Sequence, residues 1–198
     1  MPLLAAATVL SAFLLFLIQP LAGKQLLPLF GGSGAVWSAC LLFFQFALLA
    51  GYLYAHALTR WFRPRQQAMV HGACLAVCLA VPRFGFTTGA GSAHVLETLA
   101  AGVGLPYLLL STTSPLLQHW HSLLHPGGRP YRLSAWSNGA CAAALLSFPL
   151  LWEPRFSLSR MNFGWNVAFG VEAALLLAAA GLLYRANPES APRPIIYG

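Results

Sequence analysis

The hydrophobic segment 35–58 carries a stripe of polar side chains that could do chemistry. Its members are separated by seven, seven and four positions, which places them within about 40° on one face of a helix: Ser38, Gln45, Tyr52 and His56. In so apolar a segment these groups need partners, because an unpaired polar group in hydrocarbon costs several kcal/mol. The stripe is therefore interpreted either as a polar contact between helices or as the wall of a substrate pathway.

Glu172 is the one acidic residue well inside a hydrophobic segment, here 164–184. An ionisable group at such a depth is a candidate functional residue, since burying it is costly. The sequence leaves three roles open: a substrate contact, an ion pair with Arg155 or Arg160, or a carboxyl that stays protonated.

Two prolines, Pro106 and Pro115, interrupt the hydrophobic segment 94–117. Each removes a backbone donor and displaces the carbonyl group four residues earlier. Four hydroxyl residues, 111–114, lie between them and can bond to the freed carbonyls. The pattern predicts a kinked or broken helix, which occurs at transporter binding sites and also where a helix is merely bent.

Three histidines follow the same segment: His119, His121 and His125. Zinc and iron sites normally add a cysteine or a carboxylate, and no acid is near this cluster in the sequence. With His56 and His71 expected on the same side of the membrane, we interpret the histidines as a belt of amphipathic rings at the interface. No cofactor is predicted; a metal at these histidines and a bound lipid or pigment are the alternatives.

Small residues recur at four-residue spacing in the segment 133–152, at Ala135, Gly139 and Ala143. Such a face lets a second helix approach closely. It predicts a tight helix–helix contact, either within the chain or with a partner.

Composition indicates that lipid is the solvent of these segments. Hydrophobic residues make up 58% of the 198 residues and charged residues 8%, against about 25% charged in an ordinary soluble domain. The chain has four glutamates and no aspartate, which leaves little for acid–base or metal chemistry. Its net charge of +7 comes from basic residues scattered in short loops, a distribution typical of contact with anionic lipid and not with nucleic acid.

Six segments approach the length needed to cross a bilayer, whose core of about 30 Å takes about 20 helical residues: 3–20, 35–58, 68–82, 94–117, 133–152 and 164–184. We expect an all-α integral membrane protein with one polytopic domain over residues 1–186 and an extended or disordered cytoplasmic tail over 187–198. Seven of the basic residues fall in one set of alternate connecting segments and four in the other. The positive-inside rule then places both termini in the cytoplasm.

An ordered series of short motifs resembles a known family. The motifs are Gln19-Pro20-Leu21-Ala22-Gly23-Lys24, Leu27-Pro28-Leu29-Phe30-Gly31-Gly32, Val36-Trp37, Phe43-Phe44-Gln45, Gly51-Tyr52-Leu53-Tyr54-Ala55-His56, Gly104-Leu105-Pro106, Ser114-Pro115-Leu116-Leu117-Gln118, Ser137-Asn138 and the stretch from Pro149 to Pro154. They resemble the N-terminal membrane region of the bacterial fused major-facilitator/spermidine synthase proteins. In that family the synthase part is a soluble domain beyond the membrane spans, so the resemblance assigns no catalytic residue to this chain.

These observations favour a non-catalytic structural or accessory subunit of a larger assembly in a bacterial inner membrane. Its expected partners are the lipid bilayer and other membrane subunits or a second copy. The alternative is a transporter half that works as a dimer on a small, polyamine-like molecule through Gln45, Tyr52 and Glu172. A third hypothesis is a redox subunit that binds a cofactor or pigment.

Overall fold

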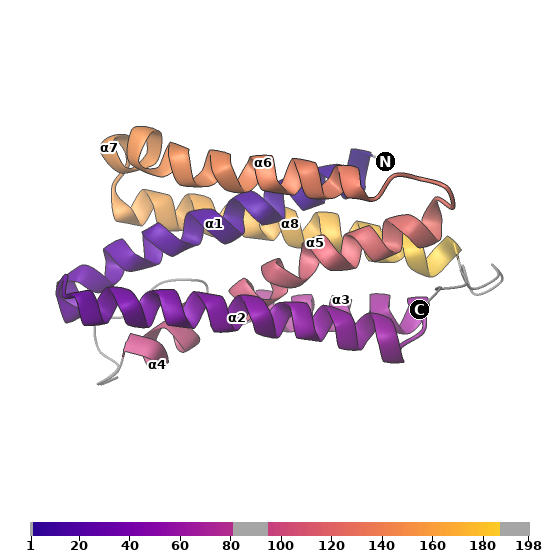
Figure 1. Ribbon diagram of the computed structural model, residues 1–198, viewed down its shortest axis with the longest axis horizontal. Helices are drawn as coiled ribbons and strands as arrows, with labels where there is room; N and C mark the ends of the chain where they lie inside the picture. Colours follow the sequence, from indigo (N-terminus) through magenta and orange to yellow (C-terminus); the bar gives the residue numbers. More distant parts are fainter. Residues whose placement is uncertain (1, 81–94, 187–198) are drawn as a thin grey trace.

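The computed structural model describes residues 2–80 and 95–186. Every regular element in these ranges is helical (Figure 1). In chain order they are α1 (Pro2–Phe30), α2 (Gly34–Trp61), α3 (Pro64–Ala80), α4 (Val95–Leu99), the π-helix η1 (Ala100–Gly104), α5 (Leu105–Leu124), α6 (Tyr131–Ser147), the π-helix η2 (Phe148–Trp152), α7 (Glu153–Arg155) and α8 (Leu158–Ala186). The predicted all-α class is confirmed for the described residues. The predicted tail, 187–198, and the end of the predicted span 68–82 lie outside them.

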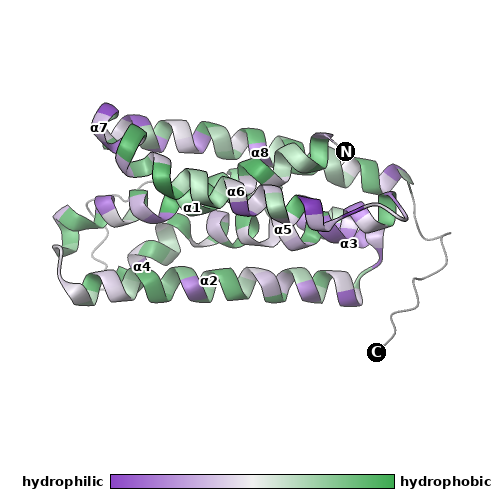
Figure 2. Cartoon of the chain, turned by 45° about the horizontal axis from the view of Figure 1, so that its top comes forward, coloured by the Kyte–Doolittle hydropathy of each residue, from purple (hydrophilic) through white to green (hydrophobic). Residues whose placement is uncertain are grey.

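Within residues 2–80 and 95–186, four helical stretches are long and apolar enough to cross a membrane: α1, α2, Val95–Leu124 and α8. The helices α3 and α6 have 17 residues each, which is about 25 Å at 1.5 Å per residue. Large apolar side chains are also exposed on the bundle, among them Phe46, Leu146 and Phe163, and Figure 2 shows hydrophobic positions along all the long helices. Soluble monomers rarely expose contiguous apolar surface on this scale, so the protein has the surface of a membrane protein.

The helices run in alternating directions through the bundle. The thiol of Cys141 lies 4.0 Å from the carbonyl oxygen of Ala12, and Lys24 forms a salt bridge of 3.0 Å with Glu153. Both contacts join residues 129 positions apart. This constant separation shows that α6 and α7 run parallel to α1.

The helix α8 runs antiparallel to both α1 and α3. Two reciprocal amide hydrogen bonds, of 2.7 and 3.1 Å, join Gln25 on α1 to Asn162 on α8. At the opposite end of α8, Arg65 of α3 donates to the carbonyl of Tyr184 and lies over its ring. The helices α1, α3 and α6 therefore point one way through the bundle and α8 points the other way.

The helix α1 forms the centre of the bundle. It packs against α5, α6 and α8, and it buries residues around most of its circumference, as expected for a helix that is apolar on all sides. The buried residues are Leu4, Ala7, Thr8, Ser11, Ala12, Leu14, Leu15, Leu17, Ile18, Leu21, Ala22, Gly23 and Leu26. The helix also continues through Pro20 to Phe30, ten residues beyond the predicted span 3–20, because an isolated proline bends a packed membrane helix without ending it.

The crossing of α2 over α5 depends on Gly51. A Cβ atom at this position would lie 2.9 Å from the carbonyl oxygen of Leu108 and would overlap the side chain of Ser111. The hydroxyl of Thr112 donates to the carbonyl of Gly51 at 3.4 Å. Only glycine lets the two backbones approach to this distance.

The predicted irregularity around Pro106 is present, and it is a π-helical segment. The π-helix η1 ends at Gly104, two residues before Pro106, whereas Pro115 lies inside the continuous helix α5. The hydroxyls of Ser111 and Thr112 both donate to the carbonyl of Leu108, at 2.8 and 2.7 Å. These hydroxyls therefore bond to the backbone of their own helix, an arrangement that bends helices.

Candidate functional site

The polar stripe of α2 lies on the outside of the bundle. Its four residues, Ser38, Gln45, Tyr52 and His56, are all exposed, and their side chains make no hydrogen bond to another residue of the described chain. The helix α2 lies along one edge of the bundle (Figures 1 and 2). Only 17% of the residues in its most apolar stretch are buried, against 39–44% in the other three candidate spans. Within the described chain, the side chains of the stripe form no hydrogen bond between helices.

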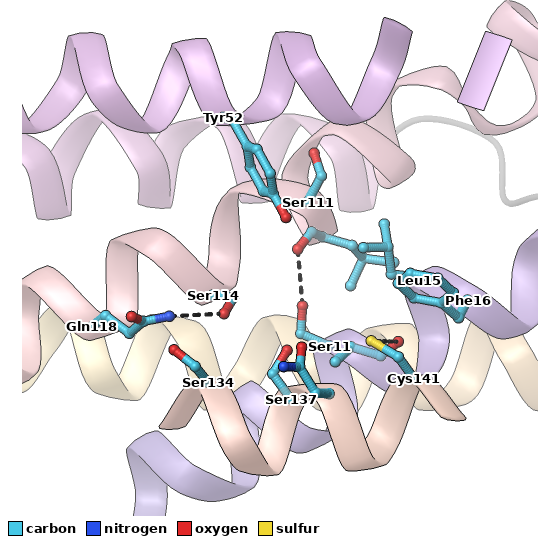
Figure 3. A pocket seen from close by; sticks show the side chains of 13 residues that line it. Ser11, Leu15, Phe16, Tyr52, Ser111, Ser114, Gln118, Ser134, Ser137 and Cys141 are labelled. Atoms are coloured by element: carbon cyan, nitrogen blue, oxygen red, sulfur yellow. Dashed lines mark hydrogen bonds between the residues drawn. The ribbon is translucent and has the colours of Figure 1, made fainter. Parts of the chain in front are cut away.

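A polar pocket lies between α1, α2, α5 and α6 (Figure 3). Its volume is about 330 Å³. The residues that line it are Ser11, Ala12, Leu15, Phe16, Tyr52, Leu110, Ser111, Ser114, Gln118, Ser134, Ser137, Asn138 and Cys141.

Hydroxyl and amide groups give this pocket its chemistry. Six hydroxyls and two amides line it, and no acidic or basic side chain does. Ser11 donates to the carbonyl of Leu110 at 3.0 Å, and Gln118 donates to the hydroxyl of Ser114 at 3.2 Å. The hydroxyl of Tyr52 points into the space between them (Figure 3). The pocket can form hydrogen bonds with a ligand and offers no formal charge to one.

The pocket unites some of the predicted residues and omits others. It brings Tyr52 of the stripe next to Ser111 and Ser114 from the proline-flanked hydroxyl run. Gln45 and Glu172, which the transporter hypothesis places beside Tyr52, do not line it.

The residues that the sequence reasoning missed come mainly from α6. Ser134, Ser137, Asn138 and Cys141 all line the pocket, and their spacing of three and four residues puts them on one helical face. That spacing is a signal in the sequence, although the small-residue series beside it on the same helix obscures it.

Glu172 is fully buried on α8, and neither carboxyl oxygen has a hydrogen-bond partner among the described residues. The alternative of an ion pair with Arg155 or Arg160 is not realised in the described chain. Arg155 instead donates to the carbonyl of Leu150 at 2.8 Å, the group that Pro154 leaves without its helical donor. Glu172 lies about 21 Å along α8 from its first residue, beyond the reach of either arginine.

Three of the described histidines pack against other rings. His71 of α3 is buried, stacked on Tyr54 and edge-on to Trp120, with ring centroids 6.0 and 6.4 Å apart. The rings of His121 and His125 stack at 5.1 Å. No group of three histidine, cysteine or acidic residues in the described ranges is arranged to hold a metal ion.

The small-residue series Ala135, Gly139 and Ala143 is exposed on α6. A Cβ atom at Gly139 would meet nothing within 4 Å. The face that packs inside the bundle is a neighbouring one, formed by Leu133, Ser137, Ala140 and Ala144. The predicted close contact therefore does not form within the described chain, and the partner alternative stays a prediction.

Comparisons of the chain with models of known families, with curated proteins and with solved structures find no match.

Proposed function

We propose that the protein is a non-catalytic subunit of a larger assembly in a bacterial inner membrane, and that it docks through the polar stripe of α2. The observation that carries this proposal is the exposure of all four stripe residues on the helix at the edge of the bundle. In hydrocarbon, each such group without a partner costs several kcal/mol. A partner helix at this edge would supply the missing bonds, worth about 0.6 kcal/mol each.

The chemistry of the stripe specifies its partner. The hydroxyl of Ser38 and the amide of Gln45 each donate and accept hydrogen bonds. We therefore assign the partner as a membrane-spanning helix with uncharged donors and acceptors, such as serine, threonine, asparagine or glutamine. A charged partner helix would bury its charge without an opposite charge to pair with.

A second surface supports the same role. The exposed small residues of α6 permit another helix to approach within backbone contact. The family resemblance agrees as well, since it covers a membrane region whose enzymatic part is a separate soluble domain.

The test is purification in a mild detergent with the native membrane as the source. The variant Gln45→Leu should lose companion subunits that the unaltered chain retains. Phe46→Leu is the matched control, because Phe46 is an exposed neighbour that carries no polar group. Unchanged companions and mass in Gln45→Leu would overturn the proposal, and a mass of two chains alone would identify the partner as a second copy.

A transporter half is the second candidate, favoured by the hydroxyl-lined pocket among the membrane helices. Saturable uptake into proteoliposomes that contain only this chain would favour it over the subunit. The two candidates differ in one further respect: Gln45→Leu should leave uptake intact if the pocket, which Gln45 does not line, carries the substrate.

A further inference from the structure

The pocket offers free hydrogen-bonding capacity. The side chains of Tyr52, Ser134 and Asn138 form no hydrogen bond to another residue of the described chain, and all three line the cavity. A hydroxyl or carboxamide can both donate and accept. A ligand that fits these groups must itself carry donors and acceptors in similar number.

The pocket is also uncharged. None of its lining residues is acidic or basic, and the buried carboxyl of Glu172 lies outside it. A charged ligand would give up its hydration here without meeting an opposite charge, which costs far more than desolvating a hydroxyl. The lining therefore selects against cations, polyamines included, and against anions.

Apolar groups complete the lining. Leu15 and Phe16 stand beside the hydroxyls (Figure 3), and Leu110 also lines the pocket. Such a lining suits a ligand that can place C–H groups against the apolar side chains and hydroxyl groups against the polar ones. The volume of about 330 Å³ lies at the lower end of the range for small-molecule sites, about 300–1,000 Å³.

From this combination we infer that the pocket between α1, α2, α5 and α6 is a binding site for a small uncharged polyol. The hydroxyls of the ligand bond to Tyr52, Ser134 and Asn138, and its C–H faces lie against Phe16 and Leu15. The site shares Tyr52 with the polar stripe of α2, whereas Ser134 and Asn138 of α6 belong to the pocket alone, so the site is tested through α6.

Cys141 provides the means of testing the site, because its thiol lines the pocket. The purified chain is treated with three thiosulfonate reagents of similar size, bearing a neutral hydroxyethyl, an anionic sulfonatoethyl or a cationic trimethylammonioethyl group. Mass spectrometry of the Cys141 peptide gives each rate, so the native cysteines need not be replaced. The variant Ser157→Cys supplies a reference thiol at an exposed position.

The hydroxyethyl reagent should modify Cys141 about tenfold faster than either charged reagent, after division by the rates at the reference thiol. Sorbitol should slow modification of Cys141, and the zwitterion betaine at equal concentration should not. In Ser134→Ala the protection by sorbitol should weaken while the reference rates stay the same. Equal normalised rates for the three reagents would show an open polar notch without selectivity, and absence of protection by sorbitol would show that no polyol binds. Either result overturns the proposal.

Discussion

The hydroxyl of Thr112 on α5 lies 3.4 Å from the carbonyl oxygen of Gly51 on α2, as the longer branch of a bifurcated hydrogen bond whose shorter branch, of 2.7 Å, goes to the carbonyl of Leu108. The bond marks the point where the edge helix meets the interior of the bundle. Since Tyr52 follows Gly51 and lines the pocket, the same crossing sets the position of one pocket wall.

Replacing Gly51 by alanine should therefore destabilise the protein, by about 1–3 kcal/mol. The new methyl group would force α2 away from the carbonyl of Leu108. Thermal unfolding of the detergent-solubilised protein measures the effect. Gly139→Ala is the control, because Gly139 faces open space and alanine there should stabilise the helix by up to about 1 kcal/mol. Equal unfolding temperatures for the two variants would contradict the close crossing.

The amide pair of Gln25 and Asn162 should contribute a measurable coupling between α1 and α8. We expect a double-mutant cycle with Gln25→Ala and Asn162→Ala to give about 0.6 kcal/mol, and no more than about 1.7 kcal/mol. Both single variants are needed, because each leaves one amide without its partner. Strict additivity of the two substitutions would show that the reciprocal bonds add nothing to stability.

Glu172→Met should raise the stability of the protein, by roughly 1–3 kcal/mol. The substitution keeps the length of the side chain and removes two buried oxygens that have no partner among the described residues. The unfolding temperature in detergent reports the change, and Leu176→Met, at a buried apolar position on the same helix, serves as the control. A loss of stability would mean that the carboxyl group has a partner in the folded protein. A gain in stability together with a loss of function would mark Glu172 as a functional residue.

Six crossings with both termini in the cytoplasm make a definite prediction for topology reporters. Fusions after Pro64 and Arg129 should report a cytoplasmic position, and a fusion at Ser157 the opposite side. The critical helix is α3, which is shorter than the four candidate spans. Reporters after Pro64 and Arg129 on opposite sides would reduce the number of crossings and contradict the six-span topology.

The sequence predicted the class and the helices, because runs of apolar residues need no knowledge of their neighbours to be recognised. Which face of each helix packs inside the bundle is harder to predict. Two series of small residues run along α6, one through Gly139 and one through Ala140 and Ala144, and the sequence reasoning chose the series that faces outward. In a helix that is hydrophobic on all sides, the apolar pattern does not distinguish a lipid contact from a helix contact.

The candidate site was predictable only in part, for a related reason. Tyr52 was recognised because it belongs to a regular stripe on one helix. Ser11 and Ser134 were missed, because their significance arises only where four helices that are distant in the sequence converge on one cavity. Glu172 was recognised by its type, whereas its lack of a partner could be seen only in the folded chain.

The central position of α1 has a consequence for biosynthesis. This helix leaves the ribosome before the other described helices, yet the indole of Trp165 reaches the carbonyl of Leu14 across 151 residues, and Asn162 reaches Gln25 across 137. Both partners belong to α8, which is made after the other described helices. The helices α5 and α6 can cover other faces of α1 earlier, but until α8 has entered the bilayer the face that carries Leu14 and Gln25 meets only lipid or a membrane insertase. A chain stalled before residue 158 would leave this face open to membrane quality-control proteases.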